Sequence, residues 1–482
     1  MLFNSFEFLL FYIIVSVLFF IINNKWRWLL LLIASYVFYS SWSISYLGLI
    51  IISTLVTYYS GILLDKQNSN LDKSENTRNK NKHRIVATSL IINLGILFFF
   101  KYYNFAATSA NSLIPNSLPF IDSLLPVVGI SFYTFQALSY TMDVYNGKIK
   151  AKRHIGKYAL FVSFFPQLVA GPIEKAANLL PQFDEHKTFD YQKVRSGVLL
   201  MVWGVFKKVV VADRLGIFVS KVYDSPESTS GIIPVIATLF FAIQLYIDFS
   251  SYSDIAIGAA RVFGYKLTIN FKRPYLSTSF GNFWKRWHIS LNSWFMEYLY
   301  IPLGGNRGKY SRTIINIIIV FLISGLWHGA SWNFVIWGAV NAFYLLVLDR
   351  YLFTTKSKRP LSLLKKIFRG TVIMLFWSLS LVFFRANNFT DAITIYSNLS
   401  FTGIDQLYDF GLNELTFKFA LGMFFFIYVI ELFQEVGYTP DNIFRAPLIV
   451  RWSIYLLLPL AIIYFGAYGS KLTDSSFIYF QF

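Results

Sequence analysis

Repeated apolar runs of bilayer-spanning length restrict the fold of this chain more than any other feature of its sequence. Of the 482 residues, 55% are hydrophobic and 20% are aromatic, whereas only 14% are charged. A soluble protein of this length cannot bury so much apolar surface, but lipid can solvate it. The sequence therefore predicts an all-α polytopic membrane protein.

The runs predict roughly a dozen membrane passes in a single membrane domain over residues 1–482, ending in an aromatic tail over 475–482. The runs lie at about 3–22, 28–42, 44–64, 85–100, 124–145, 194–221, 231–262, 311–327, 331–349, 366–384, 416–433 and 451–469. The stretch 158–175 carries Pro166, Gly171 and Pro172. It predicts a re-entrant or broken helix, which is tolerable only where other protein covers its backbone.

The distribution of Lys and Arg predicts the orientation of the chain in the membrane. The formal net charge is +18, and basic residues gather in the loops 65–84, 146–157 and 350–369. These loops should be cytoplasmic, and alternating passes then place both termini outside. In a membrane protein such a positive charge usually reflects basic loops, so no nucleic-acid partner is expected.

A basic and aromatic stretch over 270–310 is the first candidate for a functional region. Its aromatic residues recur at helical spacing over 284–298, which predicts an amphipathic helix at the membrane interface. The cations on and after this helix could attract the phosphates of a coenzyme; they are Lys285, Arg286, Arg307 and Lys309. The alternative is an interfacial belt of aromatic residues with snorkelling cations.

His328, in "SGLWHGASWNF", lies between two apolar runs and is the strongest candidate for catalysis. An ionisable side chain inside a bilayer is costly and is a functional candidate by default. A neutral imidazole can take a proton from a hydroxyl, so His328 is suited to act as a general base. The neighbours Gly325, Gly329 and Ala330 would let a substrate approach closely. The alternative is a helix-end histidine bonded to a nearby carbonyl.

Other kinds of active site find little support in the sequence. The chain has no cysteine, which excludes disulfides and thiolate nucleophiles. It lacks a GxSxG motif and a His-x-x-x-His pair, so neither a serine hydrolase nor a metal site is predicted. Asp248 and Asp254 lie within an apolar run and keep a proton-coupled transporter open as an alternative. A non-catalytic export component for polysaccharide is a third possibility.

Several motifs together resemble the membrane-bound O-acyltransferase family, and in particular its bacterial branch for polysaccharide O-acetylation. The resemblance is carried by "GISFYTFQALSYTMDVYNG", "FPQLVAGPIEK", "YIDFSSYSDIAIGAARVFGY", "FWKRWHISLNSWFMEYLYIPLGGNR" and "GLWHGASWNFVIWG". It implies a ring of tilted helices around a tunnel, with re-entrant and interfacial helices. By this resemblance His328 matches the catalytic histidine of the family, and His288 matches a second polar position that would position the donor thioester or polarise its carbonyl.

The resemblance also implies a reaction and its participants. The chain would be an O-acyltransferase of the bacterial inner membrane that moves acetyl from cytoplasmic acetyl-CoA, its acyl-donor substrate, toward an extracytoplasmic polysaccharide. No bound cofactor is expected. A separate extracytoplasmic acyltransferase of the SGNH-hydrolase type would complete delivery. The tail "FIYFQF" looks like the aromatic motif of acyl-shuttling partners, in which Tyr479 would carry the acyl group; the alternative is an interfacial aromatic anchor.

Overall fold

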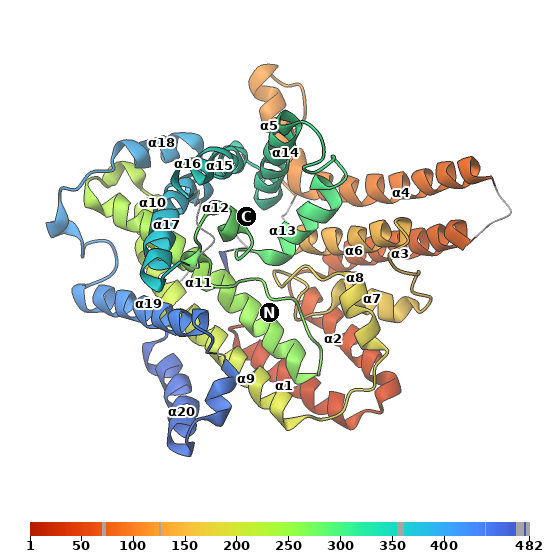
Figure 1. Cartoon of the computed structure of the whole chain (residues 1–482), viewed down its shortest axis with the longest axis horizontal. Helices are drawn as coiled ribbons and strands as arrows, with labels where there is room; N and C mark the ends of the chain where they lie inside the picture. Colours follow the sequence, from red (N-terminus) through yellow and green to blue (C-terminus); the bar gives the residue numbers. More distant parts are fainter. Residues whose placement is uncertain (70–73, 125–126, 354–360, 439, 469–476, 479–482) are drawn as a thin grey trace. The chain divides into compact units, whose positions relative to one another are not determined.

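The computed structural model describes residues 1–69, 74–124, 127–353, 361–438, 440–468 and 477–478 (Figure 1). Helices dominate these residues, and no extended strand occurs among them. The all-α prediction is therefore confirmed for the described part of the chain.

The described residues form two compact units. Unit 1 comprises residues 1–198 and 256–268, and unit 2 comprises residues 199–255 and 269–482. Two helices contribute residues to both units: α9 (Tyr191–Phe206) and α11 (Ile232–Val262). The expectation of a single membrane domain stays a prediction.

Unit 1 is built around α6, in which fourteen of sixteen residues are buried. It lies beside α3 and α4 (Figure 1). The helices of this unit are α1 (Phe6–Ile21), α2 (Arg27–Ser40), α3 (Ile44–Ser69), α4 (Glu75–Leu97), α5 (Tyr103–Leu113), α6 (Ile130–Tyr145), α7 (Ile155–Ser163) and α8 (Ala176–Leu179).

The broken helix predicted over 158–175 is present in unit 1. Helix α7 ends at Ser163, three residues before Pro166, and the chain stays non-helical until α8. Residues 158–174 are all buried. Protein thus covers the irregular backbone here, as a membrane protein requires.

Unit 2 has one hydrophobic core that joins α11 to the tryptophan-rich helices downstream, and Trp287, Trp337 and Trp377 all lie in it. Helices α14 and α15 form a hairpin, and α15 also packs on α17. The remaining helices are α10 (Asp213–Tyr223), α12 (Phe280–Trp284), α13 (Ile289–Phe295), α14 (Tyr310–His328), α15 (Trp332–Phe343), α16 (Asp349–Leu352), α17 (Leu363–Arg385), α18 (Phe389–Ser397), α19 (Glu414–Glu435) and α20 (Leu448–Phe465).

Eight helices among the described residues are long and apolar enough to cross a membrane, which is fewer than the dozen runs of the sequence. They span 44–69, 75–113, 232–262, 310–328, 332–352, 363–385, 414–435 and 448–465. The other four runs also form helix, but α1, α2 and α6 are only 14 to 16 residues long. In the fourth run, Lys207, Lys208 and Asp213 interrupt the apolar sequence. A ring of helices around a tunnel stays a prediction.

The single amphipathic helix predicted over 284–298 is wrong in its continuity. His288 has a φ of 44° and a ψ of 53°, in the left-handed region, and this turn separates α12 from α13. A non-glycine residue rarely adopts this conformation, so the helical pattern of the sequence gave no sign of the break. Trp287, Leu291 and Phe295 are buried in the protein, which shows that much of the aromatic stripe packs inward and not against a membrane surface.

Candidate active site

His328 is the last residue of α14 and lies at the tip of the α14–α15 hairpin. The chain leaves the helix at Gly329, and the side chain of Ser331 then caps α15 by accepting a hydrogen bond from the backbone N–H of Asn333. His328 itself is 7% exposed. The sequence thus folds locally into two helices joined by a tight turn, with the imidazole buried at the junction.

The glycines beside His328 serve the hairpin and not substrate access. A Cβ on Gly325 would lie 2.2 Å from the carbonyl oxygen of Phe334, and a Cβ on Gly329 would lie 2.0 Å from the Phe334 ring. Gly338 on α15 is crowded in the same way by the carbonyl of Phe321, at 2.3 Å. The role in substrate approach that the sequence suggested for Gly325 and Gly329 is therefore wrong, because Phe334 occupies that space.

Aromatic rings surround the His328 imidazole. The ring centroid of Trp337 lies 5.1 Å from that of His328, and the centroid of Phe384 lies 5.4 Å away. Trp327, the preceding residue, lies at 5.0 Å. Such a shell keeps bulk water away from the imidazole.

His288 lies close to His328 although forty positions separate them in the sequence. Their ring centroids are 6.4 Å apart, and Trp327 packs on both imidazoles. His288 is 1% exposed, and burial lowers its pKa to about 3, so its imidazole is neutral near neutral pH. The structure thus brings together the two histidines that the sequence singled out.

The turn that carries His288 is fastened to the preceding segment. The backbone N–H of Ile289 donates to the carbonyl of Asn270, and the N–H of Lys272 donates to the carbonyl of Arg286, both at 2.9 Å. The Oδ1 atom of Asn270 lies 3.2 Å from His288 Nδ1. Asn270, fully buried, was missed by the sequence analysis, since nothing in the local pattern points from position 270 to position 288.

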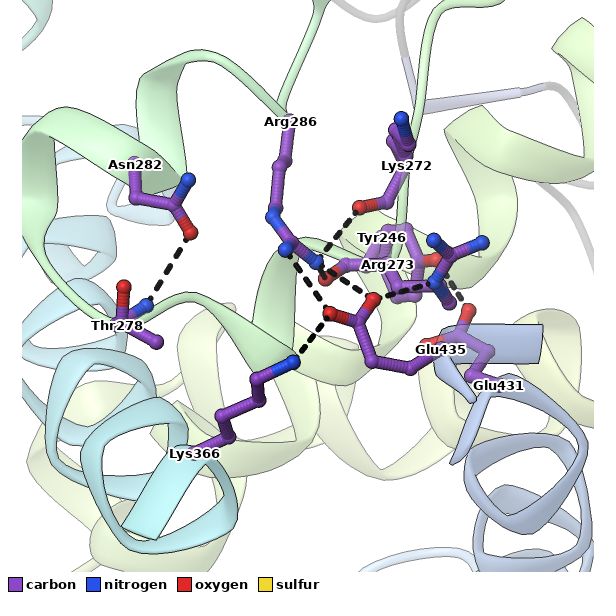
Figure 2. A network of polar contacts seen from close by, with 9 residues as sticks. All are labelled: Tyr246, Lys272, Arg273, Thr278, Asn282, Arg286, Lys366, Glu431 and Glu435. Atoms are coloured by element: carbon purple, nitrogen blue, oxygen red, sulfur yellow. Dashed lines mark hydrogen bonds and ion pairs between the residues drawn. The ribbon is translucent and has the colours of Figure 1, made fainter. Parts of the chain in front are cut away.

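The four predicted coenzyme-binding cations lie in two different environments. Lys285, Arg307 and Lys309 are exposed and pair with no carboxylate among the residues that the structure describes. Arg286, in contrast, forms an ion pair with Glu435 at the end of α19 (Figure 2). The sequence gave no indication of this pairing, because the two residues are 149 positions apart.

The Glu435 carboxylate is shared by three cations, as Figure 2 shows. Arg273 Nε lies 2.8 Å from Oε2, Arg286 Nη1 lies 3.0 Å from Oε2, and Lys366 Nζ lies 3.3 Å from Oε1. Nearby, the Tyr246 hydroxyl donates to Glu431, one helical turn earlier on α19. This cluster ties α19 to the start of α17 and to the segment that leads to His288.

Asp248 and Asp254, the two acids that left a transporter as an alternative, are both paired with lysines. Lys207 lies 2.8 Å from Asp254, and Lys208 lies 2.6 Å from Asp248 and 2.8 Å from Asp213. The sequence analysis missed both lysines, although their position within an apolar run was a signal. Each acid thus has a fixed counter-charge.

Two residues of the C-terminal tail contact the ion pair of Asp248 and Lys208. Tyr479 lies outside the described residues, but the two residues before it are buried: Phe477 is 1% exposed and Ile478 is 5% exposed. The backbone N–H of Ile478 donates to Asp248 Oδ2 at 2.8 Å, and the Phe477 ring lies 4.5 Å from Lys208 Nζ. At these two positions the tail packs inside the protein and is not an anchor on the membrane surface.

No group of three or more metal-ligating side chains occurs among the described residues. The chemistry that this region can support comes from its two buried imidazoles, which lie beside aromatic rings and are groups able to accept and donate protons.

Comparison with known proteins agrees with this chemistry. The sequence profile of the membrane-bound O-acyltransferase family matches residues 38–384, so the chain belongs to this family. The match includes His288 and His328. The chain is therefore a multi-pass membrane O-acyltransferase.

Several individual proteins of known name are similar to this chain. The chain is 37% identical over 403 residues to the probable alginate O-acetylase AlgI of Azotobacter vinelandii, covering 83% of this chain and 78% of the relative. It is 36% identical over 395 residues to the peptidoglycan O-acetyltransferase of Helicobacter pylori, covering 77% and 73%. A teichoic acid D-alanyltransferase of Streptococcus thermophilus is more distant, at 28% identity over 49% of this chain and 60% of the relative.

Proposed function

We propose that the chain moves acetyl from cytoplasmic acetyl-CoA across the bacterial inner membrane for O-acetylation of an extracytoplasmic polysaccharide. The convergence of His288 and His328 in a buried aromatic shell is the observation that carries this proposal. Two relatives that share more than a third of their aligned residues with this chain are named for acetylation of alginate and of peptidoglycan, which supports a polysaccharide acceptor.

His328 acts as the general base in this proposal. It takes the proton of the attacking hydroxyl while the hydroxyl oxygen bonds to the acyl carbon and the carbon–sulfur bond of the thioester breaks. The proton then passes to the departing thiolate, so charge and atoms balance. His288 positions the reacting groups, and the closed shell supplies proximity and excludes water.

The donor approaches from the cytoplasmic side in this proposal. Exposed Lys285, Arg307 and Lys309 attract the phosphates of coenzyme A, and Arg286 contributes the charge that Glu435 leaves uncompensated. Three cations around one carboxylate leave the cluster with a net positive charge, which supports this assignment.

The acyl group leaves by way of the C-terminal tail. Phe477 contacts Tyr252, and Ile478 contacts Asp248; on the same helix, between these positions, Phe249 packs on the ring of His288. Phe477 and Ile478 therefore contact the helix that also contacts His288, and the next residue in the sequence is Tyr479. Acylation of the Tyr479 phenol by the thioester, with His328 as base, would give an ester for an outer SGNH-type transferase to pass to the polymer.

The test uses the purified full-length chain in sealed lipid vesicles. We expect release of free coenzyme A thiol from acetyl-CoA, together with labelled acetyl on protein or added polymer, and loss of both in His328→Ala. His83→Ala, which removes an exposed histidine in unit 1, is the matched control and should keep full activity. Uptake of a substrate into vesicles without any thiol release would overturn the enzyme assignment in favour of a transporter.

A further inference from the structure

The Asn270 side chain contacts both His288 and Ser290 in the turn that carries His288. Its Oδ1 atom lies 3.2 Å from His288 Nδ1, 3.2 Å from the backbone nitrogen of Ser290 and 2.9 Å from the Ser290 hydroxyl. The side chain is fully buried, so water does not compete for these contacts. One amide oxygen thus joins three groups of the turn that carries His288.

The orientation of the Asn270 amide follows from the Ser290 backbone. The two ends of an asparagine amide can be told apart only by their hydrogen-bond partners. A backbone N–H can only donate, so the atom that faces Ser290 N must be the acceptor Oδ1. The opposite orientation would direct an amide N–H at a backbone N–H, which leaves both donors unsatisfied.

The tautomer of His288 follows in turn. Because Oδ1 can only accept, the His288 atom that faces it must be a protonated nitrogen, and Nδ1 therefore carries the hydrogen. The imidazole is neutral, so the second nitrogen, Nε2, is left with a lone pair. In this tautomer His288 cannot donate a hydrogen bond from Nε2 to a thioester carbonyl.

We propose that Asn270 is a positioning residue that holds His288 as the Nδ1–H tautomer, so that His288 serves acyl transfer as a hydrogen-bond acceptor through Nε2. The proposal rests on the proposed function, in which His288 contacts the reacting groups. Of the two roles that the family resemblance implied for His288, it retains the positioning of substrate and removes the polarisation of the carbonyl. The substrate group that His288 would hold is one with an O–H or N–H to donate.

The groups around His288 differ in what they can do to its protonation. Its contacts include Asn270, the apolar rings of Phe249 and Trp327, and the titratable ring of His328. The two rings can neither accept the Nδ1 proton as an oxygen does nor change their charge with pH. Asn270 is therefore the contact to alter.

Nuclear magnetic resonance of the full chain with ¹⁵N-labelled histidine rings tests the tautomer directly, because protonated and bare ring nitrogens give well-separated signals. The chain has only five histidines, and the signal lost in His288→Gln identifies the one of interest. We expect a protonated Nδ1 and a bare Nε2 in the wild type, and a mixture of tautomers in Asn270→Ala. A protonated Nε2 in the wild type would overturn the proposal.

Activity measurements separate a positioning role from a merely structural one. Asn270→Ala should lower kcat about tenfold or more, with a smaller change in donor KM. Asn270→Asp keeps an oxygen that can accept all three hydrogen bonds of Oδ1. The substitution removes no donated hydrogen bond, because Asn270 Nδ2 has no partner among the described residues. Its carboxylate favours the imidazolium of His288, so activity should regain near-wild-type values only at higher pH, through an ionisation that the wild type lacks.

Asn292 offers a matched control for the turn. Its Nδ2 donates to the carbonyls of Trp284 and Trp287 but makes no contact with the His288 ring. Asn292→Ala should lower stability and keep the wild-type pH profile and tautomer. Wild-type kcat and pH profile in both Asn270 variants would overturn the positioning role. If the wild type itself transfers no acetyl, the proposed function fails, whereas the resonance experiment still decides the tautomer.

Discussion

Arg286 and Glu435 face each other through two hydrogen bonds, from Nη1 to Oε2 at 3.0 Å and from Nη2 to Oε1 at 3.1 Å (Figure 2). This geometry joins the C-terminal end of α19 to a residue two positions before His288. A two-bond arginine–carboxylate pair fixes orientation as well as distance. The pair is thus one reason that the His288 turn has a defined place in unit 2.

Replacing Glu435 by Gln should destabilise unit 2, because it leaves three cations around a neutral amide. The Glu435 side chain is 6% exposed, whereas its cationic partners are 16 to 29% exposed. Breaking a fully buried pair costs about 3–5 kcal/mol, and partial solvent screening reduces this to about 2–3 kcal/mol. The free energy of unfolding in detergent measures the effect. Glu414→Gln at the other end of α19 breaks an exposed pair with Lys418 and should change stability little; equal losses in the two variants would contradict the prediction.

The stability of the protein should depend on pH through His288. Burial lowers its pKa to about 3 in the folded state, below the ordinary value of about 6.5, so only the unfolded chain takes up this proton at mildly acidic pH. The contribution of the neutral imidazole to the free energy of unfolding is complete above pH 6.5 and is lost as the pH falls toward 3. Unfolding free energies at pH 7.5 and 5 should therefore differ less in His288→Gln than in the wild type. Asn292→Ala controls for damage to the turn. If the unfolding free energy of His288→Gln changed with pH as much as that of the wild type, His288 would not be the cause of the pH dependence.

The exposed cations should act on donor binding more than on chemistry. Neutralising pairs drawn from Lys285, Arg307 and Lys309 should raise the apparent KM for acetyl-CoA roughly threefold at low salt, with a smaller fall in kcat, because exposed charges contribute about 1 kcal/mol or less each. Arg286→Gln should raise KM less and lower stability more, since its charge is already paired. Lys418→Gln is a control cation outside the cluster. If the KM for acetyl-CoA stayed at the wild-type value in every double variant, these residues would be interfacial anchors and not part of the donor site.

Labelling of single cysteines tests the predicted orientation, and the absence of native cysteine removes any background. We expect cysteines at Asn79 and Ser357 to resist a membrane-impermeant maleimide in intact cells or spheroplasts, because basic loops stay cytoplasmic. A cysteine at Gln481 should react from outside. The predicted topology would be wrong if a cysteine at 79 or 357 reacted, or if a cysteine at 481 stayed protected after all partners were removed.

Tyr479→Phe tests whether Tyr479 carries the acyl group or is only structural, because the substitution removes the hydroxyl and keeps the ring. We expect loss of polymer acetylation at normal membrane abundance. Asp248→Asn should weaken the hold on Ile478 and lower acetylation less completely. Wild-type acetylation in Tyr479→Phe would reduce the tail to a structural element.

The sequence by itself determined the class of the protein and the residues most worth testing. Apolar runs of spanning length predict helices because lipid leaves the backbone no other partner for its hydrogen bonds, and the described part of the chain has eight such helices. His328 stood out because an ionisable side chain is costly in apolar sequence, whereas His288 stood out only through the resemblance to the family. The break in the helix near Pro166 could also be predicted from the sequence, because proline removes a backbone hydrogen-bond donor.

The tertiary structure alone decided which of these residues meet and what each glycine and cation does. Arg286 is committed to Glu435, 149 positions away, and Gly325 makes room for Phe334 and not for substrate. The left-handed turn at His288 divides what reads as one amphipathic helix. These outcomes depend on long-range packing and on pairing of buried charge. Local periodicity carries no information about such partners, because each partner's position is fixed only when the helices pack.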